Sequence, residues 1–249
     1  MSMYIITHKA FALPIRAEGY RTLLVGACKG HVFGDCFDDT GDNISGKNPN
    51  YCELTGLYWL WKNCRDSFIG IVHYRRYFTH SYSGKTALTN QEVEKLLGKY
   101  DVVLPFHAAY RETIGEDYCA LSGKREDLER VRRIIQELHP AYLADYDRIM
   151  NGHTCHLYNM MILSKDRFDA YCAWLFSILF ALEPEVHLEE YNDYQKRIYG
   201  FLGERLLNVW VLHNRLRVSE VGVLPTEVRR GPLTKFLTGC KRAVLYRFL

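Results

Sequence analysis

The hydrophobic positions along the chain fall into short apolar runs, which are separated by longer stretches with helical spacing. The short runs are rich in β-branched and aromatic residues and predict strands. The run "FIGIVHYRRYF" is apolar on both faces through Val72, which is typical of a central parallel strand. The predicted strands span residues 3–11, 20–27, 68–78, 101–105, 157–163 and 217–228.

The longer stretches repeat apolar residues every three or four positions and therefore predict helices. In "YCELTGLYWLWKN" the repeated positions are Leu54, Leu57, Tyr58 and Trp61, which share one helix face. Thr89 is suited to cap the helix that follows it. Helices are predicted at residues 51–63, 89–100, 124–140, 140–150, 164–182 and 200–216, with polar loops at 34–50, 106–122 and 183–195.

This order of elements predicts an α/β fold with a mostly parallel central sheet flanked by helices. We expect one domain over residues 1–224 and a basic amphipathic tail over residues 225–249. In the tail, cations such as Lys235 and Arg242 alternate with leucine and aromatic residues. This pattern fits a helix that lies on an anionic membrane surface, and equally a helix that docks on its own domain.

Composition narrows the class of protein. The 249 residues are 48% hydrophobic and 24% charged, as in ordinary soluble globular proteins, and a net charge of +3 is too small to indicate nucleic acid as a partner. The eight cysteines form no CxxC pair, and "MSMYIITHKAF" enters a strand without a signal peptide. We therefore expect free thiols and a cytoplasmic location. The longest uncharged apolar run, residues 170–182, is too short to span a membrane.

Two predicted strands end in cationic side chains. The regular part of the first strand ends at Thr7, His8 and Lys9, and Arg75 and Arg76 follow the apolar part of the third strand. Because ligands of α/β sheets bind outside the carboxyl ends of the strands, we expect these cations to face one crevice. Guanidinium forks and an ammonium group fit a diphosphate. The neighbours at the same strand ends are Thr7, His8, His73 and Tyr74.

The loop over residues 34–50 borders the same crevice, and its amides and carboxylates suit the hydroxyl groups of a ribose or hexose. The alternative is that nearby carboxylates pair with the two arginines, which would make the cluster structural. The motifs GxGxxG, GxxxxGK[ST] and GxSxG are absent, which disfavours a dinucleotide site, a phosphotransferase and a hydrolase. The candidates in or just after the loop are Asp38, Asp39, Asp42, Asn43, Asn48 and Glu53.

Five segments occur in the order "MYIITHK", "DDTGDNISGKNPNYCELTGLYWLWKN", "IGIVHYRRYF", "YNMMILSKDRFDAYCAWLF" and "RIYGFLGERLLNVW". Together they resemble a bacterial glycosyltransferase family of capsular and exopolysaccharide biosynthesis, whose domain was long catalogued as of unknown function. The resemblance covers most of residues 3–224. It implies a GT-A-like domain that transfers a hexose, with galactose or galactofuranose favoured, from a UDP-sugar to a growing, lipid-linked surface polysaccharide. Such an enzyme would work in the cytoplasm, at the inner face of the cell membrane.

The resemblance also bears on metal use. In most GT-A enzymes the corresponding strand ends in Asp-x-Asp, which holds a divalent metal on the diphosphate. Here it ends in "HYRR", whose cations would neutralise the diphosphate directly, so we expect no metal cofactor. The one literal Asp-x-Asp, Asp145–Asp147, lies in a predicted helix, where its carboxylates point about 200° apart. Asp38, Asp39 and Asp42 leave Mn²⁺ or Mg²⁺ as the alternative.

An inverting transferase needs a general base for the acceptor hydroxyl group, whereas a retaining mechanism needs no strong base. Glu204 begins an apolar helical face, and the alternative is that it pairs with Arg197 or Arg205. Tyr158 and Asn159 stand at a predicted strand start, where they suit hydrogen bonds to the transferred sugar. The candidates for the base are Glu204, Asp193 in the preceding loop, and Glu116 and Asp117 in a loop that would close over the acceptor.

The sequence therefore supports a glycosyltransferase as the first hypothesis. A non-catalytic carbohydrate-binding or assembly protein on a degenerate transferase fold is the alternative.

Overall fold

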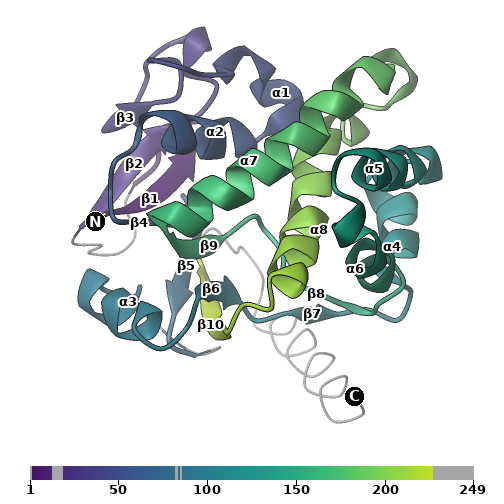
Figure 1. Ribbon diagram of the computed structural model, residues 1–249. Helices are drawn as coiled ribbons and strands as arrows, with labels where there is room; N and C mark the ends of the chain where they lie inside the picture. The colour runs from purple at the N-terminus through teal and green to yellow at the C-terminus, as the bar shows by residue number, and fades with distance from the viewer. Residues whose placement is uncertain (1, 13–18, 82–83, 85, 227–249) are drawn as a thin grey trace, which may run out of the picture.

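Eight strands form the central sheet in the computed structural model of the chain, which describes residues 2–12, 19–81, 84 and 86–226. Four of them lie side by side and run parallel, and Figure 1 shows the first three in purple. In spatial order these four strands are β3 (Cys36–Phe37), β2 (Tyr20–Leu24), β1 (Ser2–Thr7) and β4 (Phe68–His73).

The other strands of the sheet are mixed in direction. β5 runs antiparallel to β4 and β10, β10 runs parallel to β6, and β9 runs antiparallel to both β6 and β4. The pairings thus close a ring through β4, β5, β10, β6 and β9. The α/β class is confirmed, but the parallel arrangement holds for the first four strands only. The bounds are β5 (Arg76–Thr79), β6 (Val102–Pro105), β9 (Met161–Ser164) and β10 (Val218–Pro225).

The predicted strand 68–78 is in fact two strands. The chain reverses in a two-residue turn at Tyr74 and Arg75, and His73 pairs with Arg76 across it. A turn this short can join only antiparallel strands, since a parallel pair needs a long crossover. The prediction was wrong here because apolar residues continue beyond the turn and hide it in the pattern.

Helices cover both faces of the sheet, as the alternation along β1 shows. Tyr4 and Ile6 belong to the buried cluster that includes α2 (Leu54–Asn63), α7 (Lys165–Leu182) and α8 (Ile198–His213). Met3 and Ile5 belong to the cluster on the other face, which includes α3 (Asn90–Leu97). Successive residues of a strand point to opposite faces, so β1 is buried on both. The predicted cap of α3 is confirmed, because Thr89 and Glu92 form a capping box.

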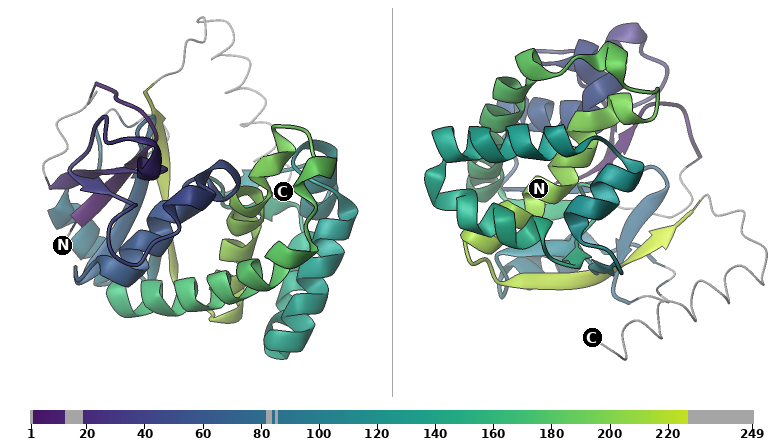
Figure 2. Two further views of the ribbon diagram at one scale, coloured as in Figure 1. Left: turned by 90° about the horizontal axis from the view of Figure 1, so that it is seen from above. Right: turned by 90° about the vertical axis from the view of Figure 1, so that its right-hand side faces the viewer.

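A group of helices forms a lobe beside α7 and α8. Figures 1 and 2 show these teal helices on the side of the molecule opposite the purple strands. The predicted helices over 124–150 are confirmed, but the predicted loop 106–122 contains α4 and the short strand β7. The missed signal was a capping box of Thr113 with Glu116. The lobe comprises α4 (Ile114–Leu121), α5 (Arg125–Leu138) and α6 (Leu143–Met150), with β7 (Ala108–Ala109) paired to β8 (Thr154–Cys155) below it.

The prediction of a basic tail falls on residues 227–249 almost entirely, and these lie outside the described residues. Its membrane contact therefore stays a prediction. Of the helices in the described ranges, none combines the length and apolarity that a membrane span needs.

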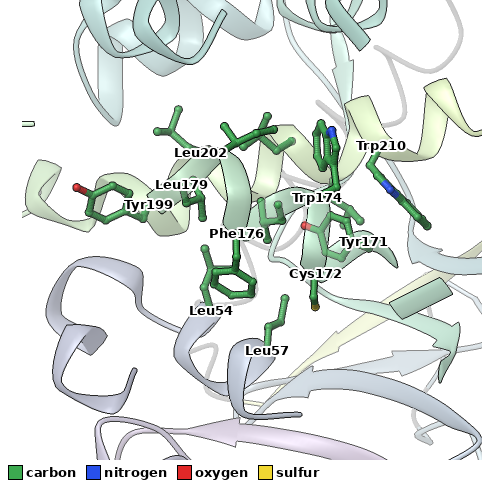
Figure 3. Close-up of a cluster of buried hydrophobic side chains, with 14 of the residues drawn as sticks. Leu54, Leu57, Tyr171, Cys172, Trp174, Phe176, Leu179, Tyr199, Leu202 and Trp210 are labelled. Carbon is green, nitrogen blue, oxygen red and sulfur yellow. The ribbon is translucent and has the colours of Figure 1, made fainter. Parts of the chain in front are cut away.

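The main core lies between α2, α7 and α8. Leu54 and Leu57 of α2 point toward Phe176 of α7, as Figure 3 shows, and all three side chains are buried. Trp210 of α8 packs beside Tyr171 of α7, with ring centroids 5.4 Å apart. This core fixes α2 and α8 relative to the sheet, and with them Glu53 at the start of α2 and Glu204 in the second turn of α8.

We expect Leu57→Ala to lower the free energy of unfolding by about 2–5 kcal/mol, because it leaves a cavity in this fully buried layer. Urea denaturation of the purified protein measures the loss. Leu138→Ala is the matched control, since the same change at a half-exposed leucine removes little buried surface. Equal losses in the two variants would contradict this account of the core.

Candidate functional site

A cavity of about 690 Å³ opens where β1 and β4 end. The β4–β5 turn and the residues after β1 form one wall, while α4, α8 and the segment before α8 form the other. The two strand ends face one crevice as expected, and Arg75 and Arg76 line it, but Lys9 does not. The predicted residues that line the cavity are Thr7, His8, Asn48, Glu53, His73, Tyr74, Arg75, Arg76, Asp117, Tyr158 and Glu204.

Arg75 and Arg76 line this cavity without a carboxylate partner. The Arg76 guanidinium lies 4.3 Å from the centroid of the Tyr158 ring, and that of Arg75 lies 5.6 Å from the Tyr74 ring. Within the described part of the chain, no aspartate or glutamate is within ion-pair distance of either group. Direct ion pairs between these arginines and carboxylates of the 34–53 region are therefore absent from the described residues, although the charge of Arg76 opposes the rise in the pKa of Glu53. The Lys9 ammonium group lies 5.0 Å from the centroid of the Tyr74 ring.

Arg197 contributes a further guanidinium group to the cavity. From the sequence, Arg197 is considered only as an ion-pair partner of Glu204. It ends the 3₁₀ turn Gln195–Arg197 just before α8, and its Nε donates to Cys52 Sγ at 3.2 Å. Its guanidinium lies 5.1 Å from the Phe201 ring. Across the described ranges it forms no ion pair with a carboxylate. The signal in the sequence was a basic pair, Lys196 and Arg197, immediately before an apolar helix.

Glu204 lies in the second turn of α8 and points into the cavity. Its Oε1 accepts a hydrogen bond from the Tyr158 backbone N–H at 2.9 Å, and its Oε2 lies 3.5 Å from Arg205 Nη1. The side chain is only 18% exposed. Burial raises the pKa of Glu204 to about 7, the Glu53 charge adds to the rise, and Arg205 opposes it. A carboxylate with such a pKa is suited to accept a proton near neutral pH.

Glu53 is a second buried carboxyl group at the cavity. Asn159 Nδ2 donates to its Oε1 at 2.7 Å and to the Gly200 carbonyl oxygen at 3.0 Å. Burial raises the pKa of Glu53, and the Asn159 hydrogen bond and the charge of Arg197 work against this rise. Asn159 is itself fully buried, so it positions Glu53 rather than lining the cavity.

Consecutive residues of one turn therefore bind the two carboxyl groups. Tyr158 and Asn159 both adopt the left-handed conformation, with φ of 77° and 49°, and Cys52 beside Glu53 has φ of 53°. Such angles are unfavourable for residues other than glycine and tend to occur at functional sites. The predicted strand 157–163 begins at Met161 for this reason, because the left-handed pair cannot join a sheet.

Asp117 reaches the cavity from α4. Arg205 Nη2 donates to its Oδ2 at 3.1 Å, and the Arg205 side chain is almost fully buried. Burial raises the pKa of Asp117, and the charge of Arg205 opposes the rise. Arg205 thus bridges Asp117 and Glu204, which come from different helices.

His73, the last residue of β4, is neutral in this setting. Burial lowers its pKa to about 3, and the charges of Arg76 and Arg75 lower it further. Its Nε2 has no hydrogen-bond partner among the described residues.

The aspartates of the 34–50 loop do not line the cavity. Asp38 is fully buried, where it accepts hydrogen bonds from the backbone N–H groups of Gly26 and Ala27. Asp39 pairs with His31, and Asp42 accepts from the Tyr58 hydroxyl group at 3.0 Å. Asn43 likewise donates to backbone carbonyls of its own loop. These side chains shape the loop, which is why their polarity misled the prediction.

Glu116 and Asp193 also lie away from the cavity. Glu116 accepts from the Thr113 backbone N–H at 2.8 Å and caps α4, so the expected loop that closes over an acceptor is wrong for this residue. Asp193 is almost fully exposed and pairs with Lys196.

Among the described residues, no group of three or more histidine, cysteine, aspartate or glutamate side chains is placed to hold a metal ion. Asp38, Asp39 and Asp42 each have a separate partner, so they form no shared set of ligands.

Comparison with known proteins identifies the family of the chain. The model of the family described as "Domain of unknown function (DUF4422)" matches residues 2–215. The chain belongs to this family. The apo structure of WbbM, a bifunctional glycosyltransferase, matches it with a TM-score of 0.81 and 28% sequence identity. That match covers 91% of this chain and 45% of WbbM, so the chain spans less than half of the larger protein. Among curated protein sequences, none matches the chain significantly.

The likeness to WbbM confirms the expected resemblance to a glycosyltransferase at the level of fold. The DUF4422 domain of this chain brings the predicted arginines, Asp117 and Glu204 to one cavity. The chemical roles assigned to these residues stay predictions.

The raised pKa of Glu204 predicts a pH dependence of stability. The folded state keeps a proton that the unfolded chain loses above its ordinary pKa of 4.5, so the stabilisation is complete below that value and is lost as pH rises through about 7. Glu204→Gln stays neutral throughout. We expect the variant to gain about 3 kcal/mol relative to the native protein between about pH 5 and pH 8.

Urea denaturation at several pH values measures this difference. Glu129→Gln, at an exposed position of α5, is the control and is expected to follow the native pH profile. Parallel profiles for Glu204→Gln and the native protein would show that Glu204 has an ordinary pKa.

Proposed function

We propose that this protein is a glycosyltransferase that moves a hexose, with galactose or galactofuranose favoured, from a UDP-sugar to a growing surface polysaccharide. The observation that carries the proposal is the pair Arg75 and Arg76, which faces the cavity with no carboxylate partner in the described residues. Glu53 and Glu204 feel the charge of Arg76 only beyond ion-pair distance, and a diphosphate would supply an anion in direct contact with both guanidinium groups. The fold likeness to a glycosyltransferase supports the same reading.

The proposed donor site uses the sheet wall of the cavity. Arg75 and Arg76 bind the diphosphate, and Tyr158, against which Arg76 is stacked, holds the guanidinium plane in place. As electrons move to the leaving UDP, these charges stabilise the oxygen that becomes anionic. We propose that this replaces a metal ion, so that neither Mn²⁺ nor Mg²⁺ is required.

The proposed chemical step is a single displacement. The acceptor oxygen forms a bond to the anomeric carbon while the bond from that carbon to the diphosphate oxygen breaks, and its electron pair leaves with UDP. Glu204 takes the proton of the acceptor hydroxyl group. A base in this role implies inversion at the anomeric carbon. Lipid linkage of the acceptor, contact with the inner face of the membrane and a cytoplasmic location belong to the same proposal, and the tail 227–249 is the segment that would make the contact.

The donor is tested by thermal shift with a panel of nucleotide sugars, each with Mn²⁺ and with EDTA. We expect UDP-hexoses to raise the melting temperature selectively and equally in both conditions, since a ligand stabilises the state that binds it. Arg75→Ala combined with Arg76→Ala is expected to weaken binding by roughly tenfold to a hundredfold for each arginine removed. Arg148→Ala, an exposed arginine of α6 that does not line the cavity, is the control.

Each outcome of the panel decides one point. A shift that requires Mn²⁺ would refute metal independence, and the absence of any shift would refute a nucleotide-sugar donor. If the double variant lost donor binding yet still restored polysaccharide synthesis in cells, the protein would be an assembly factor rather than an enzyme.

The base is tested by the rate of UDP release. We expect Glu204→Gln to lower this rate by roughly 10²- to 10⁴-fold with donor binding unchanged. In the native enzyme the rate is expected to rise with pH through about 7, as Glu204 loses its proton. Glu53→Gln removes a charge that raises this pKa and shifts the rise to lower pH, whereas Arg205→Gln shifts it to higher pH. Shifts in the same direction would exclude Glu204 as the base.

A further inference from the structure

The two walls of the cavity differ in charge. The sheet wall carries Arg75 and Arg76, which have no carboxylate partner in the described residues. On the opposite, helical wall, Arg205 is paired with Asp117 at 3.1 Å and lies 3.5 Å from Glu204. Arg197 lines the same wall without an ion-pair partner in the described residues. The helical wall thus carries two guanidinium groups, of Arg197 and Arg205, and two carboxyl groups, of Asp117 and Glu204, so that its charges balance and it offers both hydrogen-bond donors and acceptors.

The helical wall also carries an apolar lip. Leu121 at the end of α4 is 62% exposed and Tyr194 is 53% exposed, and both line the cavity. The Tyr194 ring lies 5.0 Å from the Phe201 ring, so a partly buried aromatic pair continues from the lip inward. In the described residues five large hydrophobic side chains are exposed, and two of them stand at this one opening. Large exposed apolar groups gathered at a cavity are typical of a binding surface.

An uncharged sugar ring matches both features. It has an apolar face of C–H groups that packs on an aromatic ring, and hydroxyl groups that bond to a carboxylate and a guanidinium. A phosphate or an acidic sugar would meet the carboxyl groups of Asp117 and Glu204 on this wall, and their charges oppose its own. Glu204 touches both walls, since it binds the Tyr158 backbone beneath Arg76 and contacts Arg205.

We propose that the helical wall is the acceptor subsite, and that it binds an uncharged sugar ring between Tyr194 and the Asp117–Arg205 pair. The assignment of this ring as the acceptor rests on the proposed transferase function. The binding of a neutral sugar at Tyr194 does not, and it can be measured without turnover. In this arrangement the hydroxyl group of the ring meets Glu204 at the junction of the two walls.

The test is saturation-transfer difference NMR with the full chain, with and without UDP. The probes are the methyl glycosides of galactose, glucose and mannose, together with the octyl glycosides of the same sugars. We expect at least one methyl glycoside to bind, and Tyr194→Ala to weaken its binding by roughly fivefold to tenfold through loss of the aromatic face. Tyr194→Phe retains that face and is expected to bind as the native protein does. Tyr100→Ala changes another exposed tyrosine, one outside the cavity lining, and serves as the matched control.

Three results would overturn the proposal: no methyl glycoside binds the native protein, Tyr194→Ala binds it equally well, or only octyl glycosides depend on Tyr194. The last result would assign the lip to an alkyl chain. UDP affinity, measured by calorimetry on the same samples, reports separately on the proposed transferase function. If the native protein binds a methyl glycoside but not UDP, the proposed donor site is refuted and the proposed sugar site at Tyr194 is not.

Discussion

The site depends on one short turn that binds two largely buried carboxyl groups. Tyr158 and Asn159 lie next to each other in the chain, yet one binds Glu204 through its backbone and the other binds Glu53 through its side chain. Burying carboxyl groups is unfavourable unless hydrogen bonds and opposite charges compensate for the lost water. Here the turn supplies the hydrogen bonds, and Arg76, Arg197 and Arg205 supply the charges.

The turn also connects the two halves of the fold. Glu53 precedes α2, which packs on the sheet, and Glu204 belongs to α8, which carries the helical lobe. The turn lies between β8 and β9. Its contacts with Glu53 and Glu204 therefore position α2 and α8 relative to the sheet. Cys52, Tyr158 and Asn159 have positive φ angles, which are unfavourable for residues other than glycine. These strained positions lie at or next to the residues that connect Glu53 and Glu204.

Much of this arrangement was predictable from local patterns. Apolar runs located β1, β2, β4 and β6, and the rule that ligands bind at strand ends brought Thr7, His8 and the "HYRR" segment to one cavity. The rest depended on information that a linear pattern does not hold. The reversal at Tyr74–Arg75 is not visible in the pattern, because apolar residues continue beyond it. The left-handed conformation of Tyr158 and Asn159 was not predicted, because neither residue is a glycine. Polar loop residues such as Asp38 are ambiguous in sequence, because a carboxylate can bind either a ligand or backbone N–H groups of the same chain. Here Asp38 binds the backbone N–H groups of Gly26 and Ala27. Arg197 and Tyr194 reach the cavity only through the tertiary packing of α8.

The ring of strands has a consequence for behaviour in concentrated solution. Because β4, β5, β10, β6 and β9 return on themselves, none of these five is a terminal strand. The described central sheet therefore has its terminal edge at β3, which is two residues long and pairs with only Leu23 and Leu24 of β2, and at the start of β2. Open edges are the templates on which other chains add strands and start fibrils. Within the described central sheet, β3 and the start of β2 are the terminal edge from which that route of self-association could begin.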